Sequence, residues 1–347
     1  MIPRGRRALL PLAYGFVLAA CTAVPDAGGS AAPSAQSAPS GIEAPSFPPE
    51  AVDAATLTAY DPGLPLDLRD EAEPRDEEGA TVHDVSWLSP FGGRVSAWLV
   101  VPDGEGPFGG LVFLHGSETW RDDFLDEAVA MAHGGAVSLV IDAPFARTGD
   151  DRRHALSDFA DPEDERAMTA QAIVDVRRAY DLLAARDDVD PRRLGFVGHS
   201  WGASLGIVLA AVDARPSWLV LITGRPSWTG FLATSEEDWV VRERERLGQE
   251  AWERYLRLMA PLDAMTEIGN VDASRLYLQY GTADAVVPAE VSAELIDAAP
   301  GARADLYDAG HALDDAATAD RVAWLVDRLD LAPIPAAVLD EVGLPDR

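Results

Sequence analysis

The stretch Arg193-Leu194-Gly195-Phe196-Val197-Gly198-His199-Ser200-Trp201-Gly202 decides the fold. Its first half is an apolar run typical of a buried strand. Its second half reads G-x-S-x-G and leads into a helix-like segment. A serine at such a junction is held in a strained backbone conformation, and the glycines leave room for neighbouring backbone. The stretch therefore predicts a nucleophilic serine, Ser200, whose hydroxyl stands clear of a sheet at the end of a strand.

A base and an acid further along the chain are needed, because a free serine is a weak nucleophile. Asp284 follows the apolar stretch 276–280, and His311 follows the strand-like piece 304–308. The order serine, acid, histidine is the one expected after this kind of turn. Each residue comes just after an expected strand, and parallel strands end at one edge of their sheet. We therefore expect Ser200, Asp284 and His311 to meet at that edge.

Each of the three residues also has an ordinary explanation. The chain contains 29 glycines, so a chance G-x-S-x-G is weak evidence on its own. Asp284 suits a turn after glycine, and a lone histidine such as His311 is usually a surface or core residue. Only the order of the three residues, each placed after a strand, favours a catalytic interpretation.

With these motifs the chain resembles the serine α/β-hydrolases, especially the dienelactone hydrolase and prolyl-oligopeptidase-like esterase branch. The stretches 189–203 and 280–288 and the pair Gly310-His311 carry the likeness, which covers roughly residues 82–331. The resemblance implies an α/β-hydrolase fold and cleavage of carboxylic esters of small or medium size through an acyl-enzyme. Dienelactone hydrolases proper use a cysteine nucleophile, so the serine in this chain favours general esters over their lactone.

The resemblance also implies an oxyanion hole. The loop after an expected strand reads Leu111-Val112-Phe113-Leu114-His115-Gly116-Ser117, which matches the His-Gly-x loop of such enzymes. By that likeness the backbone N–H groups of Ser117 and Trp201 bind the oxyanion. Gly116 is the alternative first donor.

Other polar residues near these motifs have plainer interpretations. His115 is expected to shape the oxyanion loop or to border the substrate pocket. The ring of His199 is badly placed to relay a proton to its neighbour, so we expect it to pack or to form a pocket wall. Asp142 is expected to form a turn rather than to serve as a second acid. The six histidines are scattered and no glycine-rich phosphate loop appears, so we expect no metal and no cofactor.

Residues 1–20 predict export. Three arginines precede an apolar stretch, 8–20, that reads as a signal peptide and is short for a membrane-spanning helix. Leu18-Ala19-Ala20-Cys21 resembles a bacterial lipobox, which implies cleavage before Cys21 and a lipid anchor on the extracytoplasmic side of the membrane. Cys21 is the only cysteine of the chain. The alternative is an incidental cysteine in a plain signal peptide.

The segments that follow the cysteine differ in composition. Residues 21–49 are rich in Ala, Pro, Ser and Gly, which predicts a disordered linker. Residues 50–79 are acidic and broken by proline, which predicts a partly ordered lead-in. The formal net charge of −30, without any lysine, argues against nucleic acid as a partner. The oligomeric state stays open.

From residue 80 to about 335, strands and helices alternate, which predicts one α/β domain with a mostly parallel twisted sheet and helices on both faces. Residues 82–88 and 94–101 are expected to form a hairpin. A long helix is expected to begin at Asp161-Pro162, with the aspartate as N-cap. Residues 336–347 are interpreted as a C-terminal tail.

The alternation breaks between about 224 and 270, after the sixth core strand, which predicts a small helical cap insert. Its aromatic residues include Trp228 and Phe231. We expect them to line the substrate pocket as a lid, or to be the core of the insert, and both can hold.

The leading function hypothesis is a lipid-anchored serine esterase. A peptidase of the prolyl-oligopeptidase type is the first alternative, less favoured because no long gating domain is apparent. The second is an inactive hydrolase scaffold that acts as a surface-anchored binding protein.

Overall fold

The computed structural model describes residues 52–154, 156–339 and 342. The expected signal peptide, Cys21 and the linker lie outside the described residues, as does most of the expected C-terminal tail. No helix within the described ranges is long and apolar enough to cross a membrane.

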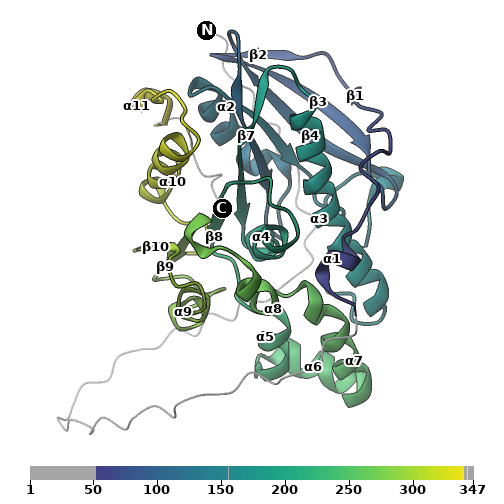
Figure 1. Cartoon of the computed structure of the whole chain (residues 1–347). Helices are drawn as coiled ribbons and strands as arrows, with labels where there is room; N and C mark the ends of the chain where they lie inside the picture. Colours follow the sequence, from purple (N-terminus) through teal and green to yellow (C-terminus); the bar gives the residue numbers. More distant parts are fainter. Residues whose placement is uncertain (1–51, 155, 340–341, 343–347) are drawn as a thin grey trace, which may run out of the picture. The chain divides into compact units, whose positions relative to one another are not determined.

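A twisted sheet forms the centre of the described chain (Figure 1). Its order is β1-β3-β4-β6-β5-β7-β8-β9-β10, and β2 pairs with β3. The strands from β6 to β10 in this order run parallel, whereas β1, β3 and β4 pair antiparallel. The expected hairpin is confirmed as β3 and β4. The bounds are β1 Arg69–Asp70, β2 Arg75–Glu77, β3 Ala80–Leu88, β4 Arg94–Pro102, β5 Phe108–Leu114, β6 Ala136–Ile141, β7 Val189–His199, β8 Trp218–Ile222, β9 Leu276–Gly281 and β10 Arg303–Tyr307.

Helices cover both faces of the sheet. Residues of α3, α4 and α9 pack on one face, and residues of α2 and α10 pack on the other. The bounds are α1 Ala54–Leu57, α2 Leu125–His133, α3 Pro162–Ala184, α4 Trp201–Val212, α5 Trp228–Thr234, α6 Asp238–Leu247, α7 Gln249–Met259, α8 Ala264–Glu267, α9 Ala289–Ala298, α10 Asp315–Arg328 and α11 Ala336–Leu339. This arrangement is the predicted mostly parallel α/β architecture.

The start of α3 follows the predicted signal. The side chain of Asp161 accepts a hydrogen bond from the N–H of Asp164 at 3.1 Å, and Pro162 occupies the first turn. An N-terminal proline costs no hydrogen bond, because the first N–H groups of a helix have no partner within it.

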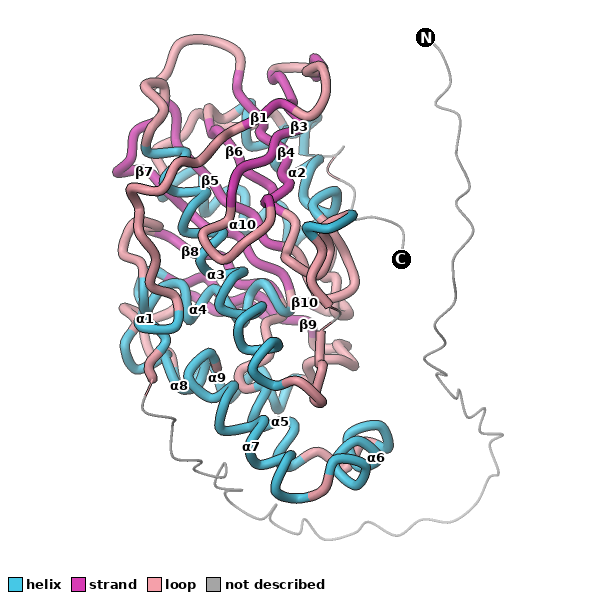
Figure 2. The backbone as a smooth tube through the Cα atoms, turned by 90° about the vertical axis from the view of Figure 1, so that its right-hand side faces the viewer, coloured by secondary structure: helices cyan, strands magenta, loops and turns pink. Residues whose placement is uncertain are grey.

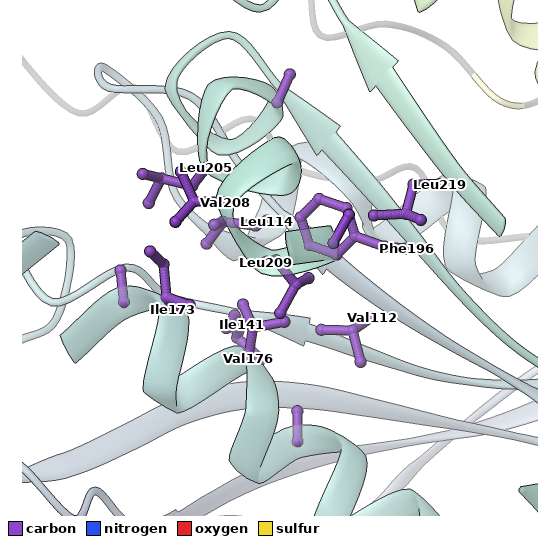
Figure 3. Packing of buried hydrophobic residues seen from close by; sticks show 14 of the residues in the cluster. Val112, Leu114, Ile141, Ile173, Val176, Phe196, Leu205, Val208, Leu209 and Leu219 are labelled. Carbon is purple, nitrogen blue, oxygen red and sulfur yellow. The ribbon is translucent and has the colours of Figure 1, made fainter. Parts of the chain in front are cut away.

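The hydrophobic core consists of two clusters, one on each face of the sheet, because successive side chains along a strand point to opposite faces. On one face Val112 of β5 and Phe196 of β7 pack with Ile173 of α3 and Leu205 of α4, as Figure 3 shows. On the other face Phe113, the residue after Val112, belongs to a second cluster with α2 and α10. The central parallel strands are therefore buried on both sides, and their carboxyl ends are fixed in space.

The described part of the lead-in adds to the edge of this sheet. Strands β1 and β2 pair antiparallel with β3. Arg178 of α3 donates to the carbonyls of Pro62 and Leu64 at 3.2 and 2.8 Å. These bonds fix the segment before β1 against α3.

The segment between β8 and β9 is helical, as predicted. Its helices α5, α6 and α7 lie together beyond α8 in Figures 1 and 2. They surround a separate apolar cluster that contains Leu232, Trp252 and Tyr255, together with Phe159 from the loop before α3. Some aromatic residues of the insert therefore form its core.

Candidate active site

Ser200 lies in the sharp turn between β7 and α4 with φ 53° and ψ −114°. A positive φ is strained for a residue with a side chain, and such strain gathers at functional sites. Steric hindrance explains why glycines occupy positions 198 and 202 on either side of Ser200. A Cβ on Gly202 would lie 2.3 Å from the carbonyl oxygen of Leu114, and one on Gly198 would lie 2.6 Å from the carbonyl oxygen of Gly202.

This close approach predicts a large stability effect. Gly202→Ala should lower the free energy of unfolding by at least about 2 kcal/mol, because the obstructing atoms belong to the backbone of Leu114 and His115 and cannot turn away. Urea unfolding measures it. The matched control is Gly269→Ala, where an added Cβ meets nothing within 4 Å, and it should change stability by less than about 0.5 kcal/mol. Equal stabilities of the two variants would contradict the packing argument.

The three residues expected to meet do so. The Nε2 of His311 lies 2.9 Å from the Oγ of Ser200, and its Nδ1 lies 2.8 Å from the Oδ2 of Asp284. Ser200 and His311 are 111 residues apart in the chain. An ionised carboxylate only accepts hydrogen bonds, so Nδ1 carries the proton and Nε2 is free to accept the serine hydroxyl.

The carboxyl of Asp284 is held in its ionised form. Its Oδ1 accepts the N–H groups of Val286 and Val287 at 2.7 and 2.9 Å. Burial pushes the pKa of Asp284 up, but the hydrogen bonds from His311 and from these two amides outweigh it, and the net pKa lies below its usual range. The acid therefore stays charged beside the imidazole at neutral pH.

The His-Gly-Ser loop runs close to this serine. A Cβ on Gly116 would lie 3.2 Å from the Cβ of Ser200 and 3.1 Å from the Nδ1 of His199. Within the described chain, no acceptor takes the backbone N–H of Ser117 or of Trp201. Both groups are thus available to an oxygen atom from outside the protein.

The buried side chain of His115 holds the His-Gly-Ser loop in place through hydrogen bonds. The residue is 1% exposed. Nε2 accepts the N–H of Ala143 at 3.0 Å, so Nδ1 carries the proton and donates to the carbonyl of Gly116 at 2.7 Å. Asp142 holds the far end of the loop, since its Oδ1 accepts the N–H of Arg121 at 2.9 Å. Both ring nitrogens of His115 are therefore used within the protein.

A pH dependence of stability follows, because burial lowers the pKa of His115 from the ordinary 6.5. Below pH 6.5 the unfolded chain takes up a proton that the folded chain resists. The stability that depends on a neutral His115 is therefore fully present above pH 6.5 and is lost as the pH falls below it. His115→Asn should therefore lose less stability than the wild type between pH 7.5 and 5.5 in urea unfolding. His83→Asn, in the partly exposed part of β3, serves as control. A His115 variant with the wild-type slope contradicts the prediction.

Two residues bind the backbone carbonyl of His311: His199, and Thr223, which has no signal in the sequence. The Nε2 of His199 donates to the backbone carbonyl of His311 at 3.1 Å, and the hydroxyl of Thr223 donates to the same carbonyl at 3.0 Å. Thr223 follows the apolar strand β8 and precedes Gly224, so its neighbours resemble an ordinary strand end.

Trp228 and Phe231 are partly buried and pack against the apolar cluster of the insert. The indole N–H of Trp228 donates to the hydroxyl of Tyr255 at 3.3 Å. The guanidinium of Arg225 lies 4.0 Å from the Phe231 ring and donates to the carbonyl of Val286, in the Asp284 loop. Phe231 is thus linked to the acid loop, whereas Trp228 faces α7.

The described residues include no group of three or more His, Cys, Asp or Glu side chains arranged to hold a metal ion. Two further polar residues at this edge of the sheet, Asp142 and Arg121, have partners within the protein. Asp142 accepts from the hydroxyl of Ser96 at 2.7 Å in addition to the Arg121 amide, and Arg121 pairs with Asp84 at 2.7 Å.

Comparisons with known proteins fit this geometry. Residues 162–310 match the prolyl oligopeptidase family, a span that includes Ser200 and Asp284 and ends one residue before His311. The acetyl xylan esterase from Paenibacillus sp. R4 is 19% identical, with a TM-score of 0.65 over 82% of this chain and 96% of that chain. The chain has the α/β-hydrolase fold.

Two further structures support that assignment. Acetyl xylan esterase 1 from Thermoanaerobacterium sp. JW/SL YS485 is 18% identical, with a TM-score of 0.58 over 76% of this chain and 88% of that chain. A cold-adapted esterase from an Arctic intertidal metagenomic library is 19% identical, with a TM-score of 0.53 over 75% of this chain and 99% of that chain. At such identities the likeness concerns the α/β-hydrolase fold, which confirms the fold prediction.

Proposed function

We propose that this α/β-hydrolase is a serine hydrolase that cleaves carboxylic esters of small or medium size. The observation that carries the proposal is the unbroken chain of hydrogen bonds from Ser200 through His311 to Asp284. In this arrangement the imidazole accepts the hydroxyl proton as the serine oxygen attacks an ester carbonyl. The carboxylate keeps the imidazole in the required tautomer and stabilises its charged form.

The rest of the cycle uses the same groups. The tetrahedral intermediate collapses when His311 gives its proton to the leaving alcohol, which leaves the acyl group on Ser200. The imidazole then activates a water molecule, which releases the acid. The N–H groups of Ser117 and Trp201, which have no acceptor in the described chain, would bind the oxyanion, and one such donor is typically worth about 10²–10³ in rate. Phe231, beside the acid loop, would border the substrate.

Peptide hydrolysis is the alternative that a specific observation favours, namely the match of residues 162–310 to the prolyl oligopeptidase family. Three solved structures of the same fold belong to proteins named as esterases, and on that balance we rank ester cleavage first. An inactive binding scaffold would have no reason to keep the complete set of Ser200, Asp284 and His311 in hydrogen-bond contact.

A fluorophosphonate probe and a substrate panel test the function. The folded protein should take one label, at Ser200, and should hydrolyse p-nitrophenyl esters of short and medium acyl chains faster than a proline-amide substrate. A folded protein that takes no label, while a control hydrolase does, rules out the enzyme. Faster cleavage of the proline amide favours the peptidase.

We also propose that the protein is exported and anchored through a lipid on Cys21, on the strength of the lipobox-like Leu18-Ala19-Ala20-Cys21. Mass spectrometry of the mature N-terminus from membranes of the source cells tests this. A diacylglyceryl group on an N-terminal Cys21 is the expected result. An unmodified cysteine, or cleavage elsewhere, overturns it.

A further inference from the structure

Thr223, the residue after β8, has a backbone conformation that needs a reason. Its φ is 48°, and it is fully buried. A positive φ is unfavourable for a β-branched residue, because the branched side chain crowds its own backbone. Such a conformation persists only where the surroundings impose it, and it gathers at functional sites.

The surroundings of Thr223 show what this conformation achieves. Its N–H donates to the carbonyl of Gln279 at 2.8 Å, which ties it to β9. Its hydroxyl donates to the backbone carbonyl of His311 at 3.0 Å. The left-handed conformation therefore coincides with a direct bond from the end of β8 to the main chain of the proposed general base.

His199 makes the second bond to the same carbonyl. It is 6% exposed and directly precedes Ser200, and its Nε2–H donates to the His311 carbonyl at 3.1 Å. The opposite side of the ring lies against the oxyanion loop, where a Cβ on Gly116 would lie 3.1 Å from its Nδ1. The ring thus fills the space between the oxyanion loop and the histidine loop.

The histidine loop, residues 308–314 between β10 and α10, has no helix or strand to hold it. Its position therefore depends on hydrogen bonds from neighbouring segments. The acid loop holds its first part, since Thr282 and Ala283 donate to the carbonyls of Tyr307 and Ala309 at 2.7 and 3.0 Å. At His311 itself, the carbonyl has two lone pairs, and the hydroxyl of Thr223 and the imidazole of His199 are two donors to it.

We propose that Thr223 and His199 are positioning residues for His311, an inference that rests on the proposed function. By holding its carbonyl they keep Nε2 within hydrogen-bond distance of Ser200 while the imidazole gains and loses a proton. Neither residue touches the reacting atoms in this role. A displacement of the base by about 1 Å is enough to lower the rate by orders of magnitude.

The test compares Thr223→Val, which keeps the shape and removes the hydroxyl, with Thr223→Ser, which keeps the hydroxyl. With p-nitrophenyl acetate, the valine variant should lose about 10-fold in kcat with KM within about twofold, and the serine variant should recover most of that loss. His199→Leu should lower kcat similarly, with His199→Gln partly restoring it through its amide N–H. The Thr223→Val/His199→Leu double variant should lose more than the product of the single losses, because each single variant keeps one donor.

Thr58→Val is the matched control. Thr58 is equally buried, and its hydroxyl donates to the carbonyl of Ala54 at 2.8 Å, in α1. Its variant should have a lower melting temperature and the wild-type kcat. Wild-type kcat in Thr223→Val, or a loss of kcat shared by Thr58→Val, overturns the inference.

A second measurement separates this inference from the proposed function. The proton on Nδ1 of His311, held by Asp284, should give a downfield ¹H NMR signal in the wild type without any substrate. In the double variant this signal should broaden or vanish while the fold is retained. If the wild type cleaves no ester, the proposed function fails, and the signal still decides the positioning role. An unchanged signal in the double variant overturns that role.

Discussion

Ser200→Ala should lower ester hydrolysis by about 10⁴-fold or more, because the variant cannot form the acyl-enzyme and only binding and the oxyanion donors remain. The fold should survive, since the substitution removes one hydroxyl and leaves the backbone of the turn unchanged. Steady-state rates on p-nitrophenyl acetate and fluorophosphonate labelling measure the effect, and circular dichroism checks the fold.

Ser292→Ala is the matched control for this experiment. Ser292 is buried in α9, and its hydroxyl donates to the carbonyl of Ala289 at 3.0 Å in the same helix. Its variant should keep both the label and a rate within about threefold of the wild type. A folded Ser200→Ala protein that keeps its label or its rate would place the nucleophile elsewhere.

The arrangement of the site could be predicted because the signals are local. An apolar run followed by G-x-S-x-G specifies a strand and its turn, and the sequences around Asp284 and His311 each specify a strand end. Parallel strands bring their carboxyl ends to one edge whatever the chain between them does. Three residues far apart in sequence therefore meet without any knowledge of the contacts between them. The start of α3 could be predicted for the same reason, because an N-cap aspartate followed by a proline marks the start of a helix within two residues.

The parts that the sequence did not reveal depend on contacts between distant segments. Thr223 follows an ordinary apolar strand, and nothing beside it indicates a positive φ or a bond to His311. The bond from Ala143 to His115 likewise joins the loops that follow two neighbouring strands, β6 and β5, which are separated by a helix in the chain. A residue's partner in another loop depends on register and packing, and composition does not encode them.

Asp284→Asn should lower kcat at neutral pH by about 10⁴-fold. The new amide can donate to Nδ1 of His311, which moves the imidazole proton to Nε2. That nitrogen then cannot accept the hydroxyl proton of Ser200, although all three side chains keep their places. Fluorophosphonate labelling should slow by a similar factor, because it uses the same activated serine.

Asp308→Asn tests whether any carboxylate near the histidine would serve. Asp308 is exposed and lies three residues before His311, so its variant should keep kcat within about twofold.

The stability of the protein at acid pH gives an independent check on Asp284. The pKa of Asp284 is below its usual range, so its contribution to stability is present above the ordinary carboxyl pKa and is lost as the pH falls through the folded value. Asp284→Asn should therefore flatten the loss of stability below about pH 4. A variant that keeps both the wild-type kcat and the wild-type acid profile would show that this carboxylate neither orients the imidazole nor stays ionised beside it.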